Sequence, residues 1–85
     1  MKVERSPHFV FEFHCLPASM RQRVSKALKR YDVNPLHPGL RLKKMKGKKN
    51  MWEMRVSRGY RITFSKMANG IFLRHVGTHD ILRKE

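Results

Sequence analysis

Acidic residues are scarce in this sequence: six Asp and Glu stand against twenty Lys and Arg, so the formal net charge is +14 over 85 residues. Self-repulsion among so many positive charges costs folding free energy, and an anionic partner would relieve it. Between Asp32 and Asp80 the single carboxylate is that of Glu53. An acid so isolated in a basic stretch is expected to have either a structural partner or a chemical role.

Cysteine and long apolar runs are scarce as well. The single cysteine, Cys15, excludes an internal disulfide framework and weakly favours a reducing compartment such as the cytoplasm. We expect it to be buried next to Leu16. Purely apolar runs such as Phe9-Val10-Phe11 are too short for a transmembrane helix or a signal segment. A hydrophobic content of 40% nevertheless excludes a disordered tail, and the length predicts one domain over residues 1–85.

The sequence also offers little for metal binding, nucleophilic catalysis or base stacking. The few aromatic residues stand mostly at apolar positions, which favours contact with phosphates by charge over stacking of single-stranded bases. His75 and His79 have a ligand-like interval but straddle a strand and its exit, so we expect neither a metal nor another cofactor. His75 is expected to pack or to bond locally. No nucleophile motif or glycine-rich phosphate loop is present.

Two helices are expected near the N-terminus, after a short strand in the opening segment MKVERS. The alternation of Phe9, Phe11 and Phe13 could indicate a strand, but Ser6-Pro7 is a good helix start, so we expect a helix over residues 7–14. A second helix begins within residues 16–19 and ends at Asn34-Pro35. An apolar stripe identifies its buried face: Met20, Val24, Ala27, Leu28 and Tyr31.

Three strands follow, in residues 51–57, 60–66 and 71–76. A three-residue loop over 57–59 would place all apolar residues of the first pair on one face, with Val56 opposite Tyr60 and Met54 opposite Ile62. Gly59 would then take a left-handed conformation. The order strand, helix, helix and three strands, with the helices on one face of the sheet, predicts an α+β domain.

The other face of this hairpin carries charges. The same register sets Arg55 opposite Arg61 and places Glu53 diagonal to Arg61. Like charges that face each other across a strand pair are destabilising, and a phosphate held between the two guanidinium groups would reverse that effect. The alternative, which spacing alone favours, is that both arginines extend into water while Glu53 forms an ion pair with Arg61.

Residues 41–49, RLKKMKGKK, are the most basic segment of the chain. Its six cations are Arg41, Lys43, Lys44, Lys46, Lys48 and Lys49. Such a run is often only a solvated surface. Here it adds to a second cluster of five basic residues in 21–30. We therefore expect the six cations of 41–49, together with Arg58, to contact a phosphate backbone by charge.

The segments HPGLRLKKMKG, MWEMRVSRGYRITF and IFLRHVGTHD, in this order and spacing, resemble the RelE/ParE superfamily of toxins from type II toxin–antitoxin modules. The resemblance covers nearly the whole chain. It implies a small, twisted, mainly antiparallel four-stranded sheet with two N-terminal helices on one face, in the order β-α-α-β-β-β. It also supports a helix at residues 7–14.

The resemblance implies one of two functions. RelE-like members are ribosome-dependent mRNA endonucleases that activate the ribose 2′-hydroxyl without a metal, whereas ParE-like members poison DNA gyrase. The high positive charge favours the RelE-like branch. A catalytically inactive RNA-binding domain is a further alternative.

For the RelE-like branch, the resemblance implies a role for each of four residues. Arg61 would stabilise the phosphate with Arg55, Glu53 would be the base and His79 the acid. A late tyrosine of several relatives is absent, since residues 80–82 are Asp, Ile and Leu. The implied partners are a cognate antitoxin, the ribosome and mRNA, in the cytoplasm and without a cofactor. The cations of the basic run 41–49, with Arg58, would hold the phosphates of messenger or ribosomal RNA.

Overall fold

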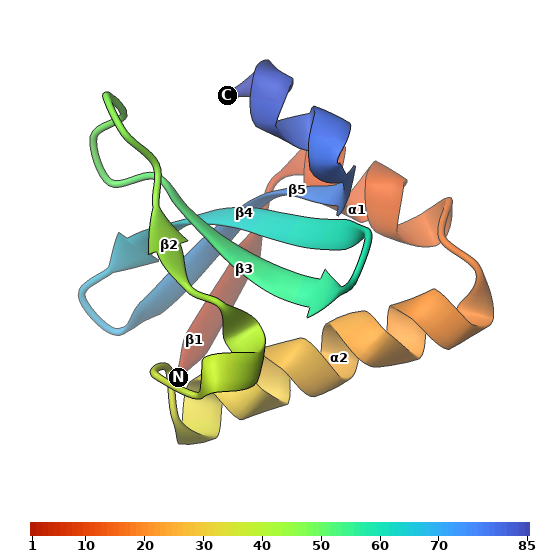
Figure 1. Cartoon of the computed structure of the whole chain (residues 1–85), viewed down its shortest axis with the longest axis horizontal. Coiled ribbons are helices and arrows are strands. Elements are labelled where there is room, and N and C mark those ends of the chain that lie inside the picture. The colour runs from red at the N-terminus through yellow and green to blue at the C-terminus, as the bar shows by residue number, and fades with distance from the viewer.

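The computed structural model describes residues 1–85, except the side chain of Lys84. Five strands form one sheet in the order β1-β5-β4-β3-β2, in which only β1 and β5 run parallel (Figure 1). The strands are β1 (Lys2–Arg5), β2 (Lys43–Lys44), β3 (Trp52–Ser57), β4 (Tyr60–Met67) and β5 (Gly70–Thr78). The helices are α1 (Pro7–His14) and α2 (Ala18–Val33), with two 3₁₀ helices, η1 (Pro38–Leu40) and η2 (His79–Lys84).

This architecture confirms the α+β class and the two helices on one face of a mostly antiparallel sheet. It differs from the expected four strands in the short strand β2, where two residues of the basic run pair with β3. None of the helices in the described residues is long and apolar enough to cross a membrane.

Helix α1 begins as its sequence predicts. The Ser6 hydroxyl accepts a hydrogen bond from the Phe9 N–H at 3.0 Å, and Pro7 occupies the first position, where its missing N–H is harmless. The Ser6 hydroxyl also donates to the Arg74 carbonyl at 2.6 Å, which ties the start of α1 to β5. Cys15 ends the helix and is exposed, so the expectation that it lies in the core is wrong. Its position as the cap leaves its side chain at the surface.

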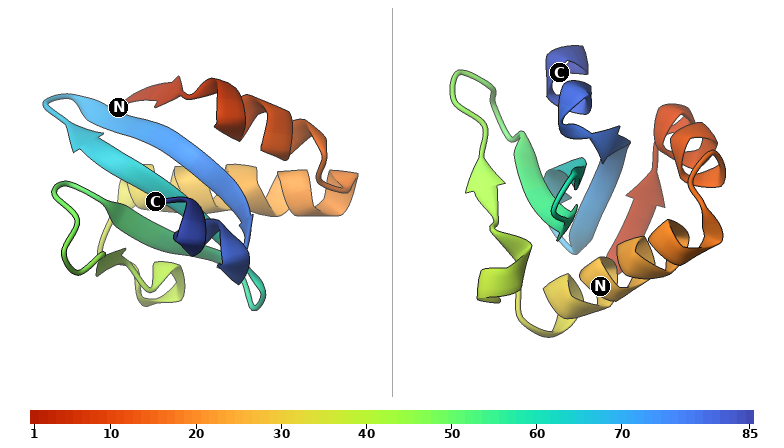
Figure 2. Two further views of the ribbon diagram at one scale, coloured as in Figure 1. Left: turned by 90° about the horizontal axis from the view of Figure 1, so that it is seen from above. Right: turned by 45° about the vertical axis from the view of Figure 1, so that its right-hand side comes forward.

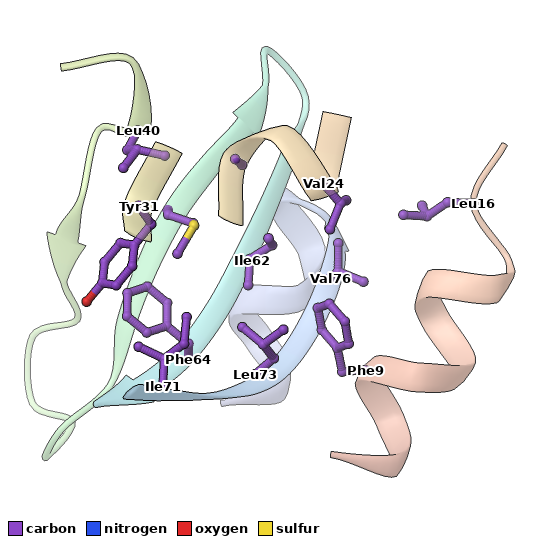
Figure 3. Packing of buried hydrophobic residues seen from close by; sticks show 12 residues of the cluster. Phe9, Leu16, Val24, Tyr31, Leu40, Ile62, Phe64, Ile71, Leu73 and Val76 are labelled. Atoms are coloured by element: carbon purple, nitrogen blue, oxygen red, sulfur yellow. The ribbon is translucent and has the colours of Figure 1, made fainter. Parts of the chain in front are cut away.

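Both helices pack against the same face of the sheet. Figure 3 shows side chains from α1 and α2 gathered against those of β4 and β5: Phe9, Val24, Tyr31, Ile62, Phe64, Leu73 and Val76. Tyr31 meets Phe64 edge to face, with 5.4 Å between ring centroids. The helix η2 crosses the opposite face, where it contacts β4 and β5 (Figure 2).

The hairpin register is confirmed over most of its length. Trp52 pairs with Phe64, Met54 with Ile62 and Arg55 with Arg61. Its end differs, because Ser57 and not Val56 pairs with Tyr60. The loop is one residue shorter than expected, and Val56 forms a bulge that makes up the difference. The residues before Val56 therefore keep the expected partners and faces. Gly59 does not adopt a left-handed conformation, and that expectation is therefore wrong.

Candidate RNA-cleavage site

Glu53 and Arg61 lie together on the open face of the sheet, the face that α1 and α2 do not cover. Glu53 pairs with Thr63 across the strands, and its Oε1 lies 3.8 Å from Arg61 Nε. Their side chains are only 14% and 21% exposed. The expected diagonal ion pair is therefore present, but Arg61 does not extend freely into water.

Arg55 and Arg61 are anchored to the same backbone oxygen. Arg55 Nε donates to the Ser57 carbonyl at 3.3 Å, and Arg61 Nη1 donates to it at 3.2 Å. The two nitrogens can therefore be no farther apart than 6.5 Å, the sum of these distances. Arg61 Nη1 also donates to the Tyr60 carbonyl at 3.2 Å. Backbone oxygens thus hold two guanidinium groups close together, and each group has further donors that an anion could use.

Arg55 also lines a groove of about 230 Å³ between β3 and α2. Arg23, Lys26 and Arg30 line the same groove, together with Ala27 and Val56. Four cations thus surround this groove, and no acid is among its lining residues. The basic cluster at 21–30 was visible in the sequence, but its proximity to Arg55 depends on how α2 packs against β3.

All cations expected to bind RNA are exposed: Arg41, Lys43, Lys44, Lys46, Lys48, Lys49 and Arg58. Lys43 pairs with Glu53, so residues of the basic run continue the open face at its edge. Lys44 and Lys66 approach the Trp52 ring, with their Nζ atoms 6.0 and 3.7 Å from its centroid. The Trp52 ring is thus engaged in two cation–π contacts with lysines of the same chain.

The two late histidines have different surroundings. His79 is exposed at the start of η2, two residues after Gly77, the strand partner of Arg61. Of the described contacts, none joins His79 to Glu53, Arg55 or Arg61. His75 is buried, with Nδ1 at 3.1 Å from both carboxylate oxygens of Glu12, which confirms that it bonds locally.

The structure therefore brings three of the four proposed catalytic residues together and leaves His79 apart from them. Within the described side chains, no group of three or more His, Cys, Asp or Glu could hold a metal ion. What the open face offers is a carboxylate that can accept a proton beside cations that can neutralise a phosphate.

This architecture is that of the RelE, YafQ and YoeB toxins, whose solved structures match nearly the whole chain. A chain of the RelB–RelE antitoxin–toxin complex from Methanococcus jannaschii is 23% identical, with a TM-score of 0.75 and 95% of each chain covered. YafQ from E. coli is 15% identical, with a TM-score of 0.76, covering 95% of this chain and 96% of that one. YoeB from Staphylococcus aureus is 18% identical, with a TM-score of 0.79, covering 93% of this chain and 97% of that one.

No family model and no curated protein matches the sequence. At identities this low, the structural likeness establishes a shared fold. The resemblance that the sequence motifs suggested is thus confirmed for the fold.

Proposed function

We propose that this protein is the toxin of a toxin–antitoxin pair and acts as a ribosome-dependent mRNA endonuclease. One observation carries the proposal. Arg55 and Arg61 both donate to the Ser57 carbonyl oxygen, and the carboxylate of Glu53 lies beside Arg61. The fold shared with solved toxins and the net charge of +14 support it.

The proposed reaction needs no metal. The Glu53 carboxylate takes the proton of a ribose 2′-hydroxyl, whose oxygen then attacks the adjacent phosphorus. Arg61 and Arg55 neutralise the charge that builds up on the phosphate oxygens. The P–O5′ bond breaks, and a protonated His79 gives its proton to the leaving oxygen. The products are a 2′,3′-cyclic phosphate and a 5′-hydroxyl. His79 enters this scheme through the sequence resemblance, and it would come near the scissile bond only in the RNA complex.

The remaining cations suit a large polyanionic partner. The exposed basic run and the groove of Arg23, Lys26, Arg30 and Arg55 offer phosphate contacts to messenger and ribosomal RNA. Solved structures of relatives include complexes with the antitoxins RelB, DinJ and YefM. We propose that a cognate antitoxin likewise holds this protein inactive in the cytoplasm.

A reconstituted translation reaction tests the proposal. New messenger 5′ ends are mapped by primer extension, with and without ribosomes, for wild type, Arg61→Ala and Arg61→Lys. We expect new ends only with ribosomes. Arg61→Ala should lower the cleavage rate about 10²–10³-fold with RNA binding largely kept, because it removes a donor to the transition state. Arg61→Lys keeps the charge without the planar fork and should recover little of the rate.

Lys2→Ala serves as the matched control, because it removes one exposed cation from β1 at the far edge of the sheet. It should cleave like wild type. Intact messenger at toxin concentrations that arrest cells would contradict the proposal and would lead to an assay for gyrase cleavage complexes. An Arg61→Ala variant whose binding falls in proportion to its activity would instead indicate a binding domain without catalysis.

A further inference from the structure

A second carboxylate is buried on the open face. The Glu85 side chain is only 1% exposed, with Oε1 at 3.0 Å from Arg74 Nε and Oε2 at 2.5 Å from Thr63 Oγ1. Lys48 Nζ donates to the backbone oxygen of the same residue. Donors from β5 and β4 thus converge on the Glu85 carboxylate, and a donor from the basic loop binds the backbone oxygen of the same residue.

This carboxylate lies next to the candidate cleavage site. Thr63, which donates to Glu85, is the strand partner of Glu53 and lies two residues after Arg61 in β4. Side chains directly opposite on neighbouring strands have Cβ atoms about 4.5–5.5 Å apart. Glu85 therefore contacts the strand neighbour of Glu53, on the same face as the Glu53–Arg61 pair.

The donors to Glu85 are held by the fold itself. Thr63 pairs with His75 and Phe64 with Leu73, so Arg74 is the extra residue of a bulge in β5. Bulges re-aim a side chain, and this one is fixed by the hydrogen bond from Ser6 Oγ to the Arg74 carbonyl. Thr63 is fully buried in the central strand β4. Both groups would keep their positions if Glu85 left.

The segment that carries Glu85 is the less firmly built part. It follows η2, a six-residue 3₁₀ helix, and such helices are seldom longer than three or four residues because their hydrogen-bond geometry is poor. Ile81, 5% exposed, anchors the first turn of η2 against Gly77. The residues after Ile81 could therefore lift while Ile81 stays in place.

We propose that Thr63 and Arg74, with Lys48 at their side, form a phosphate subsite for the RNA strand, and that the Glu85 carboxylate fills it in the free protein as a resident anion. This inference rests on the proposed function. A carboxylate and a phosphodiester each present two anionic oxygens, and an arginine with a neighbouring hydroxyl serves both. RNA would enter by displacing Glu85, so the free protein is partly self-inhibited.

The test compares Glu85→Ala with Glu4→Ala. Both variants remove one ion-paired carboxylate, but Glu4 lies on β1 and pairs with Lys2 at 3.5 Å. The probe is a 2′-O-methyl RNA oligonucleotide, which has no free 2′-hydroxyl to react, and binding is followed by fluorescence anisotropy at several salt concentrations. Glu85→Ala should bind about tenfold more tightly than Glu4→Ala, the effect of about one charge-assisted hydrogen bond. Its salt slope should be steeper by about 0.7, for one further phosphate contact.

Adding Arg74→Ala to Glu85→Ala should abolish the gain, because it removes the main donor of the subsite. Equal affinity of Glu85→Ala and Glu4→Ala would overturn the proposal and leave Glu85 as an anchor of η2 alone. If Glu85→Ala does not fold, Glu85→Gln against Glu4→Gln gives the same comparison with the side-chain volume kept.

Inorganic phosphate separates this proposal from the proposed function. Phosphate should raise the melting temperature of Glu85→Ala more than that of Glu4→Ala, and Arg74→Ala should remove the difference. That result without any RNA binding would establish the subsite and contradict the endonuclease. RNA binding and cleavage that are identical in both variants, with equal phosphate effects, would support the endonuclease and refute the subsite.

Discussion

Glu53 and Glu85 each lie against an arginine on the same sheet face, but with different geometry. The Glu53 pair is 3.8 Å long and both of its side chains are partly exposed. The Glu85 pair is 3.0 Å long and joins a buried carboxylate to an arginine that is 37% exposed. A separation of 3.8 Å is longer than a hydrogen bond, so Arg61 and Glu53 attract each other while their donors and lone pairs remain available to a ligand. Glu53 is therefore better placed to exchange a proton, and Glu85 to hold a segment in position.

Tyr31 provides a test at the residue scale. Burial raises its pKa above the ordinary value of 10.0, because the charged phenolate would lose its hydration in the core. Above pH 10 the unfolded chain releases this proton while the folded chain retains it. The contribution of the Tyr31 hydroxyl to the free energy of unfolding is thus complete below pH 10. It is lost as the pH rises through the pKa of the folded state.

The measurement is urea unfolding of wild type and Tyr31→Phe from pH 8 to 11. The difference in unfolding free energy between the two should shift in favour of Tyr31→Phe above pH 10, by at most about 1.4 kcal/mol per pH unit. The comparison cancels the titration of the lysines, which both proteins share. A difference that stays constant over this range would show that the Tyr31 hydroxyl titrates alike in both states.

At the scale of helices and strands, the sequence predicted the features that depend only on neighbouring residues. Ser6-Pro7 predicted the start of α1 because capping involves only neighbouring residues, and the apolar stripe predicted the buried face of α2. The bulges at Val56 and Arg74 were not predictable, because each depends on which strand lies opposite. Strand β2 was missed because its two lysines are typical of surface loops and pair only after β3 has formed.

The candidate site divides in the same way. The register of one hairpin was enough to place Glu53, Arg55 and Arg61 on one face. The groove between α2 and Arg55, and the contact of Glu85 with Thr63 and Arg74, join segments far apart in sequence. The pattern of residues within one segment does not show which distant segment will lie beside it. The groove and the Glu85 contacts are therefore visible only in the folded structure.

Substitutions at two glycines test the pairing of β1 with β5 and the loop between β3 and β4. A Cβ at Gly70 would lie 1.7 Å from the Lys2 carbonyl oxygen, so Gly70→Ala should push β1 from β5 and cost roughly 1–3 kcal/mol or more. Gly59 has open space and no left-handed conformation, so Gly59→Ala should be neutral or stabilise by up to about 1 kcal/mol.

Urea unfolding of both variants measures these effects, with Gly59→Ala as the matched control. A strong loss of stability in Gly59→Ala would contradict the two-residue loop and restore the left-handed turn expected from the sequence. Unchanged stability in Gly70→Ala would mean that β1 does not pair closely with β5.

For the whole molecule, the charge imbalance sets the response to salt. With a net charge of +14 on a small surface, screening should stabilise the fold. Raising NaCl from about 20 mM to about 0.5 M shortens the screening length several-fold. The melting temperature should then rise by several degrees, since 1 kcal/mol corresponds to about 4–8 °C in a domain of this size.

Scanning calorimetry of wild type and a Lys46→Glu, Lys49→Glu double variant provides the measurement. Both lysines are exposed, and reversing them lowers the net charge to +10, because each change removes two positive units. The double variant should therefore melt higher at low salt and respond less to NaCl. A wild-type melting temperature that falls with salt would show that attractive ion pairs outweigh the repulsion.

The parallel pairing of β1 with β5 has a consequence for the timing of synthesis. Lys2 pairs with Gly70, and the Ser6–Arg74 contact likewise spans 68 positions. At translation rates of about 5–20 residues per second, the first strand waits about 3 to 14 s for its neighbour. The sheet is completed only when β5 has been translated, so the face that carries Glu53, Arg61 and Arg74 does not exist before that point. A nascent chain of this protein therefore cannot present that face to any partner until β5 has emerged, and whatever binds there meets the chain only after the sheet has closed.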